Sequence, residues 1–188
     1  PLVEGGVGHA QHLGRERLVA HDELLDAPRV GLVPGDGYAP LGEGRFRVRP
    51  DSRDELARAL AESVDARAGQ APRVLHLGSV SGSSGPHNSA QAFEIAATSG
   101  FWSLVALTQA AFDRGLAEGL EVLVVVDGLA RLDGEGGGRF AEKAAVLGAS
   151  RDIPLEIRGL RMRVVDVPCI DSPEVPAWLP EALVAEAA

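Results

Sequence analysis

The stretch EVLVVV at residues 121–126 decides the fold. A continuous run of valine and leucine is typical of a strand in a parallel sheet that has helices over both faces. We therefore expect 121–126 to be the central strand. A second apolar stretch, VLHLGSV at 74–80, leads into SGSSGP at 81–86, where glycine and proline indicate a loop. We expect these two strands to be neighbours.

The residues between the two strands have the spacing of a helix. Within 88–115, apolar positions recur at helical intervals: Phe101, Leu104, Val105, Thr108, Ala111 and Phe112. Gly100 is a point at which this helix can divide in two. Because a strand–helix–strand unit closes right-handed almost without exception, we expect the strands to be parallel and the helix to cross one face.

The segments before this unit predict two short strands and a helix. The strands are RVGLVP at 29–34 and RFRVR at 45–49, and alternating arginines give the second one a solvent-exposed face, so we place it at an edge. The helix at 50–64 begins with a capping box of Ser52 and Glu55. Its apolar stripe consists of Leu56, Leu60 and Val64.

The C-terminal part continues the alternation of strands and helices. LRMRVVDV at 160–167 alternates like a strand, and a proline-rich stretch at 168–176 precedes a short helix at 178–187. The order of elements predicts an α/β chain with a truncated, Rossmann-like, three-layer fold and a largely parallel sheet. We expect one domain over 1–188, with an irregular unit at 1–28 and a linker plus helix at 168–188.

Composition limits the setting and the partners. The formal net charge is −9, which disfavours nucleic acid. Cys169 is the only cysteine, so no internal disulfide forms, and we expect a cytoplasmic protein. No apolar run approaches the roughly 20 residues that cross a bilayer, so we expect no membrane partner. The start at Pro1 slightly favours a piece of a longer polypeptide.

Three loops are candidates for ligand binding, and each lacks part of the required pattern. GGVG at 5–8 follows only a short apolar stub, whereas dinucleotide binding needs a full strand and a helix N-terminus. The serine-rich loop at 81–86 has no lysine after its last glycine, so it does not match a phosphate loop. Asp127 ends the strand at 121–126, where a catalytic carboxylate is possible, but before Gly128 we interpret it as a turn former.

The histidines do not form a convincing metal or catalytic site. His9 and His12 lie one turn apart, but no cysteine or convincing carboxylate completes a metal site, and we interpret them as surface residues. His76 lies in an apolar strand, where we expect a hydrogen-bonded core histidine. No Gly-x-Ser-x-Gly elbow follows a strand, which disfavours a hydrolase. We expect no metal-binding residues.

The acid–base pair of a short-chain reductase is also absent. That chemistry needs a tyrosine as proton donor and a lysine four residues later. The single tyrosine is Tyr38 and the single lysine is Lys143, and the position four before the lysine is Arg139. The Tyr-x-x-x-Lys pair is therefore absent.

Several stretches together resemble one known family over nearly the whole chain. They are GGVG at 5–8, PGDGYAPLGEGRFRVRP at 34–50, VLHLGSV at 74–80, GFWSLVALTQA at 100–110, the strand at 121–126 and EKAAVLGASRDIPLEIRGLRMRVVDV at 142–167. In order and spacing they resemble the structural subdomain of the ketoreductase in modular type I polyketide synthases. The match rests on packing residues more than on chemical ones.

The resemblance implies a subdomain that has no catalytic residues and no cofactor-binding residues and that supports a neighbouring catalytic subdomain. That neighbour would bind NADPH and reduce β-ketoacyl groups held on an acyl carrier protein, which this chain would meet only indirectly. The chain departs from the family at 1–28, which is less regular, and at Asp127, where a small polar or basic residue is expected. Trp102 adjoins Phe101, and we interpret it as a packed helix residue rather than a partner contact.

Other functions stay open at this point. The chain could be a free-standing, degenerate NADPH-dependent reductase, in which case it would enhance NADPH fluorescence. It could be an independent interaction module with a Rossmann-like shape. It could also be a structural pseudo-ketoreductase beside a methyltransferase or a dehydratase.

Overall fold

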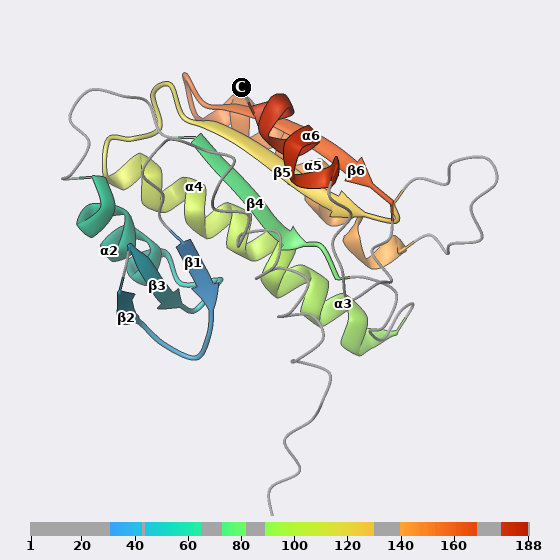
Figure 1. The fold of residues 1–188 in the computed structure, drawn as a ribbon, viewed down its shortest axis with the longest axis horizontal. Helices are drawn as coiled ribbons and strands as arrows, with labels where there is room; N and C mark the ends of the chain where they lie inside the picture. The colour runs from blue at the N-terminus through green and yellow to red at the C-terminus, as the bar shows by residue number, and fades with distance from the viewer. Residues whose placement is uncertain are drawn as a thin grey trace, which may run out of the picture.

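A computed structural model describes residues 31–42, 44–64, 73–81, 89–129, 140–168 and 178–187. Helices and strands alternate along these segments (Figure 1). The elements are β1 (Gly31–Pro34), β2 (Ala39–Gly42), β3 (Arg45–Val48), α2 (Arg53–Val64), β4 (Arg73–Ser79), α3 (Ala90–Ala96), the π-helical η2 (Ala97–Trp102), α4 (Ser103–Asp113), β5 (Glu121–Asp127), the 3₁₀ turn η3 (Ala141–Lys143), α5 (Ala145–Glu156), β6 (Arg161–Val167) and α6 (Trp178–Ala187).

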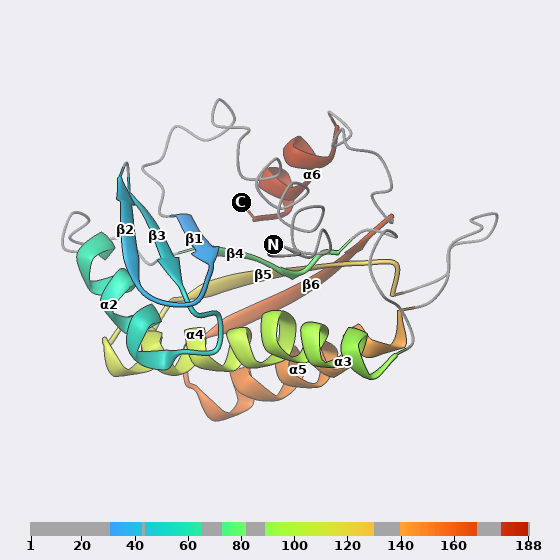
Figure 2. The ribbon, with the colours of Figure 1, turned by 90° about the horizontal axis from the view of Figure 1, so that it is seen from below.

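The main sheet confirms the expected core. Its order is β4-β5-β6, and all three strands are parallel, so β5 is central among them. One face of β5, at Val122, Val124 and Val126, packs on the layer of α4 and α5. The other face, at Leu123 and Val125, packs against α6. Figure 2 shows the resulting three layers, with α3, α4 and α5 on one side of the sheet and α6 on the other.

A second sheet combines β1, β3 and β2 in that order. Strand β3 is parallel to β1 and antiparallel to β2, so the prediction of an edge position for 45–49 is wrong. The sequence analysis missed β2, whose four residues APLG include a proline and a glycine, both of which are uncommon in strands. The alternation in β3 is confirmed, since Phe46 and Val48 are buried and Arg45 and Arg47 are exposed.

The start of α2 differs in detail from the predicted capping box. The Glu55 carboxylate accepts hydrogen bonds from the Arg49 backbone N–H and from Arg49 Nε, each at 2.7 Å. It does not reach the N–H of Ser52, because that group already donates to the Arg49 carbonyl at 3.1 Å. The backbone hydrogen bond from Arg49 is the largest cause that lowers the pKa of Glu55. The cap therefore joins the end of β3 to the first turn of α2.

The helix predicted at 88–115 is one continuous run from α3 through η2 to α4. Gly100 lies in the π-helical turn and does not divide the run. The turn packs closely on β4, because a Cβ atom on Gly78 would overlap the carbonyl oxygen of Ser99. A Cβ atom on Gly100 would lie 2.5 Å from Ser79 Oγ. Two glycines thus permit the close contact between strand and helix.

The predicted apolar stripe of this helix is only partly correct. Leu104, Thr108 and Ala111 are buried, but Phe112 is 62% exposed. The reason is that α2 packs beside α4. The side of α4 that faces α2 carries Ala106, Leu107 and Ala110, which are buried, and Phe112 does not lie on that side. The interpretation of Trp102 as a packed residue is also wrong. Its side chain is 53% exposed and meets the ring of Phe101 edge-on at 4.8 Å.

The same run, Ala90–Asp113, is long and apolar enough to cross a membrane by length and composition. The sequence analysis expected no such segment. Half of its most apolar 18-residue stretch is buried inside the fold. The core helices of soluble proteins are often as long and as apolar as this run. The run is therefore weak evidence for a membrane span.

The close contact between β4 and η2 gives a stability prediction. Gly78→Ala should destabilise the fold by about 3 kcal/mol, because its methyl group meets backbone that cannot move aside cheaply. Gly148→Ala is the matched control. Gly148 lies in α5 with open space around it, so this change should stabilise the protein by about 0.5–1 kcal/mol. Urea unfolding followed by circular dichroism measures both, and equal effects would contradict the packing account.

Candidate functional site

The strongest candidate site lies at the carboxyl end of β5. Open α/β sheets bind ligands outside this edge of their strands. Asp127 ends β5 and is fully buried, and Gly128 follows with a φ of 65°, a conformation that favours glycine. The backbone bends at Gly128 and Leu129, and the rest of the predicted turn lies outside the described residues. The Asp127 side chain, however, does more than form a turn.

Lys143 forms a buried ion pair with Asp127. Its Nζ contacts Asp127 Oδ1 and also donates to the Asp127 carbonyl oxygen at 2.9 Å. The exposed fraction is 3% for the lysine side chain and 0% for the aspartate side chain. The ammonium group lies 4.4 Å from the centre of the Phe140 ring, within the range of a cation–π interaction. Lysine and aspartate are thus held by several contacts out of water.

The same carboxylate connects the segments that follow two strands. The N–H of Ser81, just beyond β4, donates to Asp127 Oδ1 at 3.0 Å. Beyond β5, the N–H of Leu129 donates to Asp166 Oδ1 of β6 at 3.2 Å. The N–H of Phe140 donates to the carbonyl of Gly128 at 3.2 Å. The carboxyl edge of the sheet is therefore joined by internal hydrogen bonds among these loops.

This arrangement favours a structural role over catalysis. A catalytic carboxylate has to touch its substrate, whereas Asp127 has no exposed surface and both Lys143 and Ser81 engage it. The Lys143 ammonium group contacts this carboxylate, so its charge is not free for a phosphate group.

His76 is buried as predicted and has a hydrogen-bond partner. Its Nε2 lies 2.7 Å from Ser103 Oγ. The Ser103 hydroxyl is also within hydrogen-bond distance of the carbonyl oxygens of Ser99 and Gly100. Because those oxygens only accept, the hydroxyl donates to them and His76 Nε2–H donates to the hydroxyl. The interpretation as a core histidine is confirmed.

Tyr38 and Lys143 belong to different parts of the fold. Tyr38 stacks on Phe46 of the smaller sheet, with ring centres 6.0 Å apart, and Lys143 sits at the end of β5. Burial is the largest cause that raises the pKa of Tyr38, and Glu62 raises it further. A reductase needs the opposite, a tyrosine whose pKa a nearby lysine lowers.

Several predicted candidates lie outside the described residues. They are the glycine cluster at 5–8, His9, His12, most of the loop at 81–86, Arg139 and Cys169. In the part of the chain that the structure describes, no three His, Cys, Asp or Glu side chains come close enough to hold a metal ion.

Sequence reasoning missed the pairing of Asp127 with Lys143. It considered the lysine only as a partner for Tyr38. One signal was present, because the single lysine lies in the largely apolar segment FAEKAAV at 140–146, where a buried cation needs an acidic partner. Asp127 was the acid at the end of the buried central strand. The two residues are sixteen positions apart, and the sequence does not show whether the intervening loop brings them together.

Comparisons with known proteins show the fold. No family model and no curated protein matches the sequence. The chain superposes on the multidomain structure of adenylation, ketoreductase and pseudo Asub domains of a keto acid-selecting NRPS module, with a TM-score of 0.71 and 16% identity. It superposes on an N-terminal ketoreductase from a macrolactin assembly line with a TM-score of 0.65 and 16% identity.

The alignments include nearly all of this chain but only a small part of each of these two structures. The alignments cover 93% of this chain but only 14% of the NRPS module and 33% of the macrolactin ketoreductase. A dehydrogenase/reductase from Sinorhizobium meliloti 1021 gives a TM-score of 0.56 at 18% identity, with 89% of this chain and 70% of that chain covered. The chain therefore has the Rossmann-like α/β fold of ketoreductases and short-chain dehydrogenases.

The buried ion pair gives a second prediction. Lys143→Met should cost about 3–5 kcal/mol, because it leaves the Asp127 carboxylate buried without its cation. Asp127→Asn should also destabilise the fold, because it leaves the ammonium group of Lys143 without a counter-charge. The double variant should recover much of the loss, since asparagine still accepts from Ser81 N–H. Urea unfolding of the wild type, the two single variants and the double variant gives a double-mutant cycle. If the losses of unfolding free energy in the single variants simply add up in the double variant, the two side chains do not interact directly.

Proposed function

We propose that this chain is the non-catalytic structural subdomain of a modular polyketide synthase. In this role it supports an adjacent ketoreductase subdomain, which binds NADPH and reduces β-ketoacyl groups on an acyl carrier protein. The observation that carries the proposal is the buried ion pair at the carboxyl end of β5. There, the buried Asp127–Lys143 pair takes the place at which a working Rossmann domain would present groups to a ligand.

The hydrogen bonding at this edge argues against a nucleotide site between β4 and β5. A pyrophosphate is held by backbone N–H groups that point at it from a glycine-rich turn. Here the N–H of Ser81 is already directed at the Asp127 carboxylate. Lys143 pairs with the same carboxylate, so in the described part of this edge its charge is not available to a phosphate.

The rest of the fold is suited to a scaffold. Strand β5 and the helix pair α4 and α5 form a continuous apolar core. The short coverage of the two assembly-line structures also agrees with a part of a larger polypeptide. A supporting domain needs only a stable core and a surface for its neighbour, and this chain supplies the first of these.

A second candidate is a pseudo-subdomain of an NRPS module. The specific observation in its favour is the similarity to the NRPS module that carries ketoreductase and pseudo Asub domains. The two candidates share a non-catalytic role and differ in the neighbouring domains. The reading frame around this chain distinguishes them, because an adenylation domain next to it favours the NRPS candidate.

The test begins with the parent reading frame on both sides of this chain. The proposal expects a neighbouring domain with a complete glycine-rich nucleotide loop and a Tyr-x-x-x-Lys pair. That domain is then produced with and without this chain, and NADPH-dependent reduction of a β-ketoacyl thioester is measured. Full activity should require this chain. A frame without such a domain, or equal activity without the chain, would contradict the proposal.

The Asp127–Lys143 pair should be dispensable for that activity. The Asp127→Asn/Lys143→Met variant removes both charges. In its folded form it should support a reduction rate within about twofold of that with the wild type, which corresponds to a change of less than about 0.5 kcal/mol in activation free energy. Circular dichroism verifies that the variant is folded. Loss of activity in a folded double variant would show that the pair takes part in the chemistry.

A further inference from the structure

The outer face of the smaller sheet carries two arginines without acidic partners. Strand β3 points Phe46 and Val48 into the core and Arg45 and Arg47 outward. Most arginines of the described segments form ion pairs with carboxylates: Arg49, Arg53, Arg58, Arg73, Arg151, Arg161 and Arg163. Within those same segments, Arg45 and Arg47 form none.

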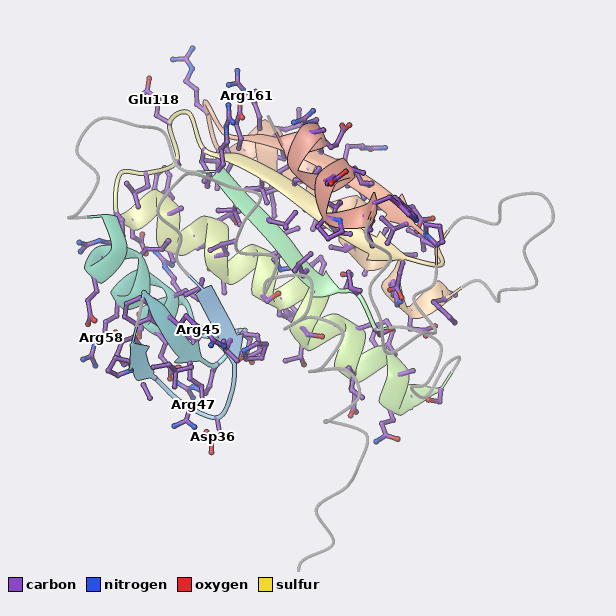
Figure 3. The ribbon with its side chains drawn as sticks, in the orientation of Figure 1. Asp36, Arg45, Arg47, Arg58, Glu118 and Arg161 are labelled. Atoms are coloured by element: carbon purple, nitrogen blue, oxygen red, sulfur yellow. The ribbon has the colours of Figure 1, made fainter. Side chains whose placement is uncertain are left out.

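Glycines in and after the neighbouring strand leave room for these two side chains. The Cγ atom of Arg45 lies 3.1 Å from the place where a Cβ atom of Gly31 would be. A Cβ atom on Gly35 would overlap the stem of Arg47. The two arginine stems therefore lie over backbone that lacks side chains. Figure 3 shows both arginines on this sheet, with Asp36 toward the Arg47 end, and Asp36 pairs with neither of them.

We propose that this face, defined by Arg45, Arg47, Gly31 and Gly35, binds an acidic helix of a partner protein. Alternate residues of one strand are about 6.7 Å apart, and carboxylates at positions i and i+4 of a helix are about 6 Å apart. Each guanidinium group can take one carboxylate in a bidentate contact. The two spacings match closely enough for both contacts to form at once.

A helix fits this face better than an added strand does. In the described sheet β1 is an edge strand, and Pro34 removes a backbone donor there, which disfavours strand addition. The arginine stems cover Gly31 and Gly35, so the contact with the helix is made by the two guanidinium groups rather than by the backbone. The net charge of −9 does not prevent this contact, because charges beyond about 8–10 Å are screened at physiological salt.

The proposal is independent of the proposed scaffold function and is tested with a defined probe. The probe is an alanine-rich helical peptide with glutamates at i and i+4, and the control peptide has glutamine at both positions. Titration is followed by NMR through the side-chain Nε–H signals of the arginines. The glutamate peptide should shift the signals of Arg45 and Arg47, less so at high salt. The glutamine peptide should shift neither.

Charge reversal supplies the matched variants. Arg45→Glu/Arg47→Glu should weaken binding of the glutamate peptide tenfold or more, which is about 1.4 kcal/mol or more. Arg114→Glu/Arg158→Glu changes the net charge equally at two other exposed arginines and should leave the affinity unchanged. Circular dichroism verifies that both variants are folded.

Three outcomes would overturn the proposal. The first is that the glutamate peptide fails to bind the wild type. The second is that it binds the Arg45→Glu/Arg47→Glu variant as tightly as the wild type. The third is that a short DNA duplex binds these arginines more tightly than the peptide does, which would assign the face to phosphate instead.

Discussion

Burial of both faces of β5 is the constraint on which the rest of the structure depends. The valines on one side need the layer of α4 and α5, and Leu123 and Val125 on the other side need α6. The last residue of this strand, Asp127, is itself fully buried. Its charge therefore requires a buried cation and backbone donors, which Lys143 and Ser81 provide.

This requirement links the architecture of the sheet to what the chain can do. The Asp127 carboxylate, at the edge where open α/β sheets bind ligands, is engaged by contacts within the protein. The loops after β4 and β5 are thereby tied to one another and to η3. The fold is Rossmann-like and resembles that of ketoreductases and short-chain dehydrogenases.

The sequence was sufficient for most elements because their signals are local. The apolar run at 121–126 and the helical spacing at 101–111 directly reflect which faces are buried. Features that depend on distant packing were not predictable. The exposure of Trp102 and Phe112 follows from how α2 and α5 border the long helix, and the middle position of β3 follows from β2, which has little strand propensity. The Asp127–Lys143 pair depends on a loop that brings η3 back to β5.

The most direct test of the central claim is a titration of NADPH with this purified chain, followed by the fluorescence of the reduced nicotinamide. The account predicts no saturable enhancement and no blue shift, because the carboxyl edge between β4 and β5 is occupied by the chain's own ion pair and hydrogen bonds. A saturable enhancement that the oxidised nucleotide displaces would contradict it. The chain would then be a nucleotide-binding domain, and the Asp127–Lys143 pair would have to open on binding.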